Sequence, residues 1–327
     1  MTEAVTTHRL EGLEPDNLLA FLALLGLLRA LEAVGAQDRI RVWLPRVSWS
    51  VEQPPLRPVL HLASPQTQKA ICEAAATGVA MLAADHDFAG QADLNYRKAE
   101  ARALLDASID KRSRADLLTS LMSDAAVKED KDQVEATPFC LLFGQGHQHF
   151  LDRFTAVPNT PEPPPRGRGK KAIARTAAEC LAETLFHTWE RPDATFAFRW
   201  DPAEDVRYAM IADDPSTQKT CTQHGANRLA AVGLAALPVV PVVRQRRVRL
   251  ATIGGSADRR GFSFAWPIWR HPASLSAIRA LLAHPHLREP EKLARNDVVQ
   301  VVEAGRMSVG KFMNFTHGRP LSNSGSL

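Results

Sequence analysis

The chain has 327 residues, enough to bury a full hydrophobic core as one large domain or two ordinary ones. Its net charge of +4 is too small to define a class of partner, so the positions of the charges matter more than their sum. The four cysteines are far apart and lack zinc-site spacing, which argues against a disulfide scaffold or structural zinc and predicts reduced thiols in a cytoplasmic protein.

A short edge strand and a long apolar helix are expected at the start of the chain. The strand covers residues 8–13, and the helix runs from about residue 18 to 34 with Asn17 as a candidate N-cap. Its most apolar part, Leu18–Leu28, is shorter than a membrane span and has no basic flank, so we expect a buried helix and no membrane contact. Gly26 would let another element approach closely.

Helices are predicted over the next part of the chain. Ser64–Ala84 is rich in alanine, with Ser64 as a candidate cap and Pro65 at the first helical position. A second helical region, Leu94–Ser123, carries charges of both signs, which is typical of a solvated face.

Polar side chains surround two glycines after the short apolar segment Phe139–Phe143. Gln145 and His147 are interpreted as loop residues that can touch a nucleic acid. His147 and His149 are alternatively a pair of metal ligands. A catalytic metal needs at least three ligands and the spacing supplies no third, so we expect no metal and no cofactor.

A basic loop follows the first half of the chain. Residues 158–171 hold five prolines and two glycines, which predict an irregular segment. A helix is expected to follow over Ala172–Trp189. The cations in and just after the loop have no acid among them: Arg166, Arg168, Lys170, Lys171 and Arg175. The alternatives are a solvated loop and a clamp that orders against phosphates, and we favour the clamp.

The densest positive charge lies in Cys221–Pro272. A helix with one buried face should stop at Pro238, after which Val248 and Leu250 alternate with two arginines, as on a strand with one wet face. Residues 254–261 predict a turn into a returning strand that completes a hairpin.

This hairpin should attract a polyphosphate backbone, because its arginines face a single acid, Asp258. The predicted phosphate contacts are Arg244, Arg246, Arg247, Arg249, Arg259 and Arg260. Asn227, at the start of the preceding helix, is a weaker candidate for base contact. Trp266 and Trp269 are expected to pack in the core or at its edge.

These elements predict an α+β fold, a mixed body of antiparallel strands or hairpins and packed helices with a long basic loop. We expect an N-terminal α+β half at 1–157, the basic loop at 158–171, and a second α+β half with the basic hairpin at 172–321. One continuous domain that contains both halves is the alternative, and residues 322–327 are interpreted as a tail or linker.

Catalytic signatures are missing from the sequence. Gly305, Gly310 and Lys311 have P-loop spacing, but Phe312 stands where a hydroxyl should bind magnesium. Neither a nucleophile elbow nor a zinc-protease motif is found. The sequence therefore predicts a protein that is not an enzyme. A metal-dependent nuclease and a scaffold whose arginines meet acidic protein surfaces remain as alternatives.

Four stretches resemble a family of CRISPR-associated proteins of type I-U, also called I-G, systems, similar to the large subunit of Cascade effectors. They are HRLEGLEPDNLLAFLALLGLLRALE (8–32), WDPAEDVRYAMIADDPS (200–216), GANRLAAVGLAALPVVPV (225–242) and FAWPIWRHPASLSAIRALL (264–282). The resemblance implies a non-enzymatic subunit that binds crRNA and target double-stranded DNA and helps read the PAM, the short motif flanking the target. It also implies contacts with other Cascade subunits and with the helicase-nuclease.

The basic loop and the basic hairpin are expected to converge on one polyanion. Neutralising Arg166–Lys171 should then weaken DNA binding and flatten its salt dependence.

Overall fold

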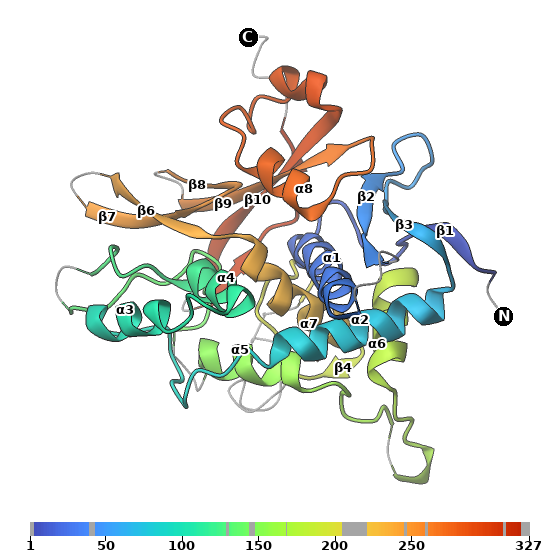
Figure 1. Cartoon of the computed structure of the whole chain (residues 1–327), viewed down its shortest axis with the longest axis horizontal. Helices are drawn as coiled ribbons and strands as arrows, with labels where there is room; N and C mark the ends of the chain where they lie inside the picture. The colour runs from blue at the N-terminus through green and yellow to red at the C-terminus, as the bar shows by residue number, and fades with distance from the viewer. Residues whose placement is uncertain are drawn as a thin grey trace.

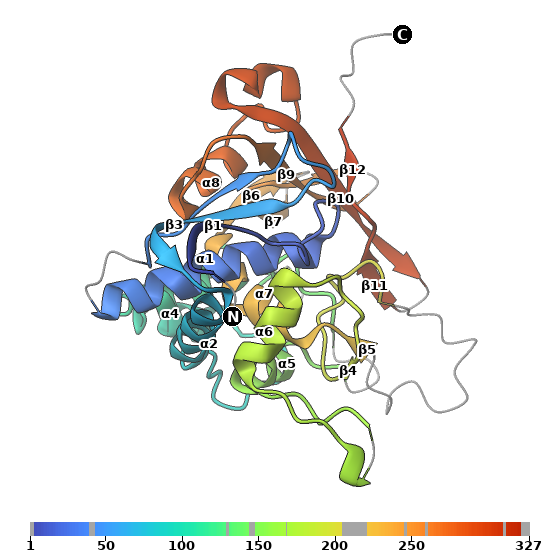
Figure 2. The ribbon, with the colours of Figure 1, turned by 90° about the vertical axis from the view of Figure 1, so that its right-hand side faces the viewer.

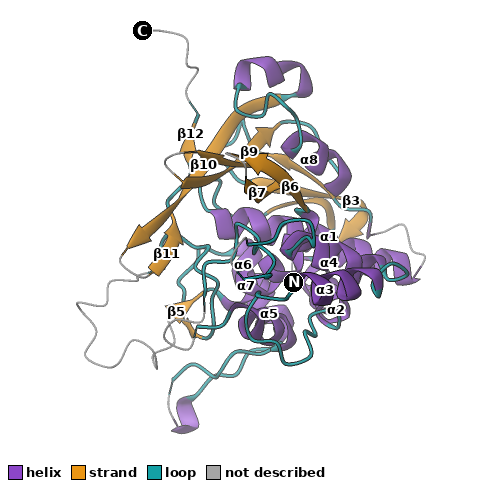
Figure 3. Ribbon diagram, turned by 90° about the vertical axis from the view of Figure 1, so that its left-hand side faces the viewer, coloured by secondary structure: helices purple, strands orange, loops and turns teal. Residues whose placement is uncertain are grey.

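The computed structural model describes residues 3–38, 43–128, 131–143, 148–167, 169–204, 221–244, 247–258, 261–309 and 312–321. It confirms the α+β class. Antiparallel strands lie above a layer of helices that contains α1, α2 and α5–α7 (Figure 3). The helices are α1 (Leu18–Asp38), α2 (Gln68–Ala83), α3 (Lys98–Asp106), α4 (Arg112–Leu121), α5 (Phe150–Asn159), α6 (Ala177–Phe186), α7 (His224–Gly233) and α8 (Leu275–Leu282), with short 3-10 helices at Gly169–Lys171, Leu234–Ala236 and Pro290–Asn296.

The strands form two larger sheets and two small ladders. One sheet has the order β1-β3-β2, and the other has the order β11-β10-β9-β8 with β12 also pairing with β10. The ladders are β4-β5 and β6-β7. The strands are β1 (Val5–Arg9), β2 (Arg46–Trp49), β3 (Pro58–Gln66), β4 (Asp193–Ala194), β5 (Cys221–Thr222), β6 (Val239–Arg244), β7 (Arg247–Thr252), β8 (Gly255–Asp258), β9 (Gly261–Trp269), β10 (Val298–Val309), β11 (Phe312–Phe315) and β12 (Arg319–Pro320).

Helix α1 lies at the centre of the molecule and crosses α7 at very short range (Figure 1). A Cβ atom added to Gly26 of α1 would lie 1.8 Å from the carbonyl oxygen of Leu229 on α7. In the same way, a Cβ on Gly233 of α7 would lie 2.2 Å from the carbonyl oxygen of Leu22. Only glycine fits at these two positions, so the predicted close approach at Gly26 is confirmed and the sequence itself fixes where the helices cross.

The apolar character of α1 reflects burial in protein. Leu18–Gln37 has the length and hydropathy of a membrane span, and 78% of its most apolar 18-residue window is buried inside the fold. A core helix of a soluble protein has this pattern because all its sides are covered. The predicted buried helix is therefore confirmed.

Residues from both predicted halves share one core. Phe21 of α1 stacks on Trp266 of β9, with ring centroids 5.5 Å apart. The indole Nε1 of Trp266 donates to the carbonyl of Pro15 at 2.9 Å, and that of Trp269 donates to the carbonyl of Val47 at 2.7 Å. The two tryptophans therefore belong to the core, as predicted, and each ties β9 to the N-terminal part of the chain.

Two predicted helices have different bounds in the structure. Strand β3 continues through Gln66, and α2 begins only at Gln68, where Thr67 caps it by accepting from the amide of Ala70 at 3.1 Å. Pairing of β3 with β1 in register Val5↔Gln66 outweighs the helix-starting signal of Ser64 and Pro65. The region 94–123 contains two shorter helices, α3 and α4.

The predicted hairpin is also paired differently. Strand β7 pairs with the preceding strand β6, from Val239↔Thr252 to Arg244↔Arg247. Gly254, with φ at +75°, makes the turn that was expected to be longer, and residues 255–258 form β8 rather than a loop. Strand β8 then pairs with β9. The sequence shows the alternation of β7 but not which neighbour it pairs with.

Candidate nucleic-acid interface

Residues 161–175, here called the arm, project from the lower end of the molecule (Figures 1 and 2). The amide of Arg166 donates to the carbonyl of Ile173 at 3.0 Å, and the amide of Ile173 donates back at 2.8 Å. A 3-10 turn at Gly169–Lys171 completes a closed loop. The arm is thus an ordered excursion in its described part, and the expected helix starts late, at Ala177, because Thr176 caps it.

The root of the arm carries a buried ion-pair network. The two terminal nitrogens of Arg166, Nη1 and Nη2, donate to the Glu183 carboxylate at 3.2 and 2.6 Å. Arg175 donates to Glu183 at 2.9 Å and to Asp193. The side chains of Arg175 and Asp193 are only 6% and 1% exposed. Burial is the largest single influence on Arg175 and opposes its charge, but the hydrogen bond to Asp193 together with the nearby negative charges of Asp193 and Glu183 raises the pKa of the guanidinium.

This network corrects two of the predicted phosphate contacts. Arg175 faces the interior and its charge is balanced by Asp193, so it cannot reach a polyanion. Arg166 is 30% exposed and already holds Glu183 at two atoms. The acids that neutralise both arginines come from α6 and β4, outside the acid-free stretch that suggested the clamp.

At the tip of the arm, one of the predicted phosphate-binding cations is exposed to solvent. Lys171 is exposed. Arg168 and the side chain of Lys170 lie outside the described residues. The described part of the arm therefore offers one exposed cation, Lys171, to a ligand.

The second basic region is the hairpin formed by β6 and β7, residues 239–252. Along β7, Val248 and Leu250 are half-buried while Arg247 and Arg249 are exposed, which confirms the predicted alternation. Register places position 244 opposite Arg247 at the end of the ladder. Arg249 is 48% exposed and forms an ion pair with Glu135 at 2.5 Å.

The other arginines assigned to this region cannot be placed. Arg246, Arg259 and Arg260 lie outside the described residues, as does the side chain of Arg244. Asp258, the acid that the sequence places near them, lies at the end of β8, beside the hairpin. Of the predicted basic hairpin, the structure therefore describes only the solvent-exposed arginines of β7.

The expected convergence of the two basic regions is wrong. The view in Figure 1 is down the shortest axis of the molecule, and it shows the arm at the lower right and the hairpin at the far left. The two regions lie on opposite sides of the helical layer. One compact polyanion site cannot be built from both.

The weaker candidates for base contact have separate outcomes. Asn227 is 1% exposed and cannot touch a base. Its amide nitrogen donates to the hydroxyl of Thr222 at 2.9 Å, and its oxygen accepts from the backbone of Phe198 at 3.4 Å. Asn227 thus supplies hydrogen bonds to buried polar groups of the loops that surround the first turn of α7. Gln145 and His147 lie outside the described residues.

A buried polar layer near α7 was missed by the sequence reasoning. Asp201 accepts from the amide of Asn17 at 3.0 Å and from Arg191 at 2.7 Å. Nearby, the Glu204 carboxylate accepts from the Thr222 hydroxyl. Burial first, and the Asp201 charge second, raise the pKa of Glu204 to about 8. Of the carboxyl groups in the WDPAED motif, Asp201 therefore ties its loop to Asn17 at the start of α1, and Glu204 ties it to Thr222 of β5.

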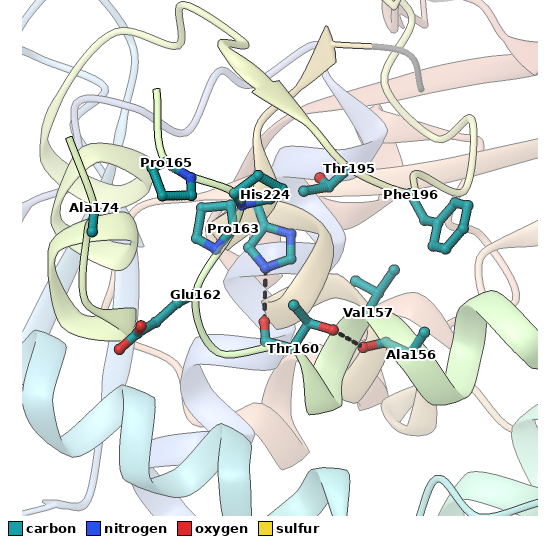
Figure 4. A pocket seen from close by; sticks show the side chains of 11 residues that line it. Ala156, Val157, Thr160, Glu162, Pro163, Pro165, Ala174, Thr195, Phe196 and His224 are labelled. Carbon is teal, nitrogen blue, oxygen red and sulfur yellow. Dashed lines mark hydrogen bonds between the residues drawn. The ribbon is translucent and has the colours of Figure 1, made fainter. Parts of the chain in front are cut away.

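A pocket at the base of the arm was also missed. It has a volume of about 420 Å³ and lies between α5, the arm prolines and the N-terminus of α7 (Figure 4). His224, Thr195 and Phe196 line it together with Pro163 and Val157. The local signal for it in the sequence is the polar run CTQHGANR, which leads into the first turn of α7 and contains His224.

The residues named for a metal site do not gather within the described part of the chain. His149 forms a pair with Asp93 at 3.0 Å, and His147 lies outside the described residues. No group of three histidine, cysteine, aspartate or glutamate side chains that could hold a metal ion occurs among residues the structure describes.

A comparison of the sequence with protein-family models finds no match, and neither does a comparison with curated proteins.

Proposed function

We propose that this chain is a non-catalytic subunit of a type I CRISPR effector of the I-U/I-G kind, acting in the cytoplasm. Its role is to bind crRNA and the target double-stranded DNA beside the PAM. The proposal rests on one observation, the solvent-exposed basic face of β7 in the β6-β7 hairpin. Arg247 and Arg249 are exposed there on one strand, two residues apart.

The geometry of the hairpin suits duplex DNA. The major groove of B-DNA is about 12 Å wide and admits a two-stranded β-ribbon. Arginine fits both uses of such a ribbon, because it binds phosphates and can also make paired hydrogen bonds to guanine. In RNA-guided effectors, base pairing with the guide reads the target, and the protein reads only the flanking duplex. A short basic ribbon matches this limited task.

The segments that carry the family resemblance support the proposal in a specific way. Those of α1, α7 and β9 pack on one another through Gly26, Gly233 and the Phe21–Trp266 stack. Strand β6 begins within the α7 segment and leads directly into the hairpin. The resemblance therefore covers the core from which the hairpin projects. On the same resemblance, the proposed partners of this chain are the other Cascade subunits and the helicase-nuclease.

The test is the salt dependence of binding to a labelled 30-base-pair duplex, followed by fluorescence anisotropy. Each phosphate contact contributes about 0.9 to the slope of log affinity against log salt, so R247Q/R249Q should lower the slope by about 2. The matched control is K69Q/R295Q, which removes the same charge at two other exposed positions. It should leave the slope within about 0.5 of the unmodified protein. Equal slopes for both variants would contradict the proposal.

An assembly scaffold is the second candidate, and one observation favours it. Val240 and Val243 of the hairpin are 52% and 75% exposed, which is unusual for large apolar side chains at the end of a ladder. If the hairpin binds only protein, V243D should abolish co-purification with the neighbouring subunits while the isolated chain shows no salt-dependent retention of DNA.

The nuclease alternative is tested separately. Labelled RNA and DNA are incubated with the pure chain and manganese, and the proposal predicts no cleavage. Cleavage that is lost in H149A would identify an enzyme instead.

A further inference from the structure

The pocket at the base of the arm contains two buried polar atoms that lack partners. Among the described residues, neither Nδ1 of His224 nor the hydroxyl of Thr195 finds a hydrogen-bond partner. His224 is 1% exposed and Thr195 is 8% exposed, and both line the pocket. An unpaired buried polar group costs about 1–3 kcal/mol, so a molecule that enters this cavity and bonds both groups gains binding energy from them.

The hydrogen-bonding role of His224 is set by its other ring nitrogen. Nε2 lies 2.8 Å from the carbonyl oxygen of Thr160, as Figure 4 shows. A carbonyl only accepts, so Nε2 carries the hydrogen and Nδ1 of the neutral ring presents a lone pair. Burial lowers the pKa of His224 and keeps the ring neutral. The pocket therefore needs a ligand that donates to Nδ1, and the Thr195 hydroxyl can serve a neighbouring acceptor or donor.

The rest of the lining is apolar and restricts the ligand further. Val157 and Ala156 of α5 form one wall, and Pro163 and Pro165 of the arm form another (Figure 4). The volume of about 420 Å³ lies in the range of about 300–1,000 Å³ that is typical of small-ligand sites. A flat, apolar ring with an N–H beside a carbonyl satisfies these walls and both polar atoms.

The charges around the pocket favour a nucleobase inside it and a phosphate outside it. Glu162 is exposed and lies at the rim, where its carboxylate repels a phosphate. Lys171 is exposed near the tip of the arm, three residues before Ala174, which also lines the pocket. A nucleotide can therefore place its base inside and its backbone along the outer side of the arm.

Resting on the proposed function, we propose that this pocket captures one unpaired nucleobase of a single-stranded nucleic acid. The base edge donates an N–H to Nδ1 of His224 and shares a second hydrogen bond with Thr195. This gives the arm a role distinct from that of the hairpin, which contacts duplex backbone on the other side of the molecule (Figure 1). The expected contact is with a displaced or terminal single strand.

The test compares two single-stranded probes of equal charge: a 12-mer of thymidylate and a 12-mer of the same backbone with abasic residues throughout. Thymine presents an N–H between two carbonyls. One captured base contributes about 1–3 kcal/mol, so the intact chain should bind the thymidylate probe about tenfold more tightly than the abasic one. T195V removes one hydrogen bond and should lower the preference to about threefold.

Two variants abolish the site in different ways. H224F removes the lone pair and fills space, and A174W adds a large ring at an exposed rim position where the fold tolerates it. Both should bring the thymidylate probe to the affinity of the abasic probe, with abasic binding unchanged. If H224F is unstable, the test rests on A174W, and an unchanged thermal unfolding midpoint for A174W shows that this variant is folded.

The outcomes separate this inference from the proposed function. Equal binding of both probes by the unmodified chain, or a preference that survives in A174W, overturns base capture and leaves the duplex-binding hairpin intact. Failure to bind either probe or duplex DNA overturns both. A preference that is lost in A174W and reduced in T195V supports the pocket.

Discussion

The arm and the hairpin have similar basic sequences but opposite environments. In the arm, Arg175 is 6% exposed and lies against Asp193, whereas in the hairpin Arg249 is 48% exposed and pairs only at the surface, with Glu135. The arm root thus uses its charge to hold α6, β4 and the arm together. The hairpin keeps its charge facing solvent. A cluster of arginines in a sequence therefore does not show by itself whether the charge serves the fold or a partner.

The largest expected effect is on the arm root. R175A removes the closer of the two cations at the buried Asp193 and leaves Arg166 at 3.5 Å, which should lower the free energy of unfolding by about 3 kcal/mol. Chemical denaturation measures this, and K171A on the same arm is the control that should stay within about 0.5 kcal/mol. If R175A unfolds like the unmodified protein and instead loses DNA affinity, the arm root is a ligand site.

A second internal charge should be visible through pH. The pKa of Glu204 rises from 4.5 in the unfolded chain to about 8 in the fold, so the folded state holds one more proton between these values and stability falls as pH rises. The slope is at most about 1.4 kcal/mol per pH unit. Buried histidines, whose folded pKa values are lowered from 6.5, change stability in the opposite sense near pH 6.5, but they do so equally in both proteins. The difference between the thermal melts of E204Q and the unmodified protein therefore isolates Glu204, and E204Q should lack its part of the decline up to about pH 8. An unchanged decline would mean that the Glu204 carboxyl is ionised in the fold.

A smaller effect is expected at the rim of the network. Arg166 and Glu183 are 30% and 32% exposed, so solvent screens their attraction. R166Q should cost only about 0.5–1 kcal/mol of stability. Comparing R166Q with R175A in the same denaturation series measures how steeply the network's contribution falls from its buried end to its exposed end. A cost for R166Q equal to that of R175A would contradict this gradient.

The smallest effect on stability is expected at the hairpin. R247Q/R249Q changes exposed side chains and should shift the free energy of unfolding by less than about 0.5 kcal/mol. Adding E135Q, which removes the partner of Arg249, controls for the acid left behind. A loss of more than about 2 kcal/mol would place these arginines among the groups that hold the fold together.

Local patterns in the sequence predicted much of the fold. The all-round apolar run of α1, the alternation in β7 and the burial of Trp266 follow from side-chain periodicity, which needs no knowledge of distant residues. The pairing of β7 with β6 and the late start of α2 did not follow. They depend on which strand is adjacent in space, and a single stretch of sequence does not record that.

The candidate site was less predictable for the same reason. The stretch that contains Arg166 and Arg175 has no acid because their partners, Glu183 and Asp193, come later in the chain. The burial of Asn227 and its bond to Thr222 depend on how the loop before α7 folds, which its own polar character does not record. The pocket joins residues from three separate segments. The polar run that leads into α7 is a local pattern within the pocket's lining, through His224, but it does not show which other segments meet there.

The most direct test of the account is to measure the salt dependence of duplex DNA binding for R247Q/R249Q and R166Q/K171Q side by side. Each double variant removes two positive charges. The account predicts that the hairpin variant lowers the log–log slope by about 2 and the arm variant by at most about 1. Arg166 is 30% exposed and held by Glu183 at two nitrogens, whereas Arg249 is 48% exposed and bonded to Glu135 through one, which leaves it freer to exchange that acid for a phosphate. A larger change for the arm variant, with the hairpin variant unchanged, would contradict the claim that the hairpin is the surface that meets duplex DNA.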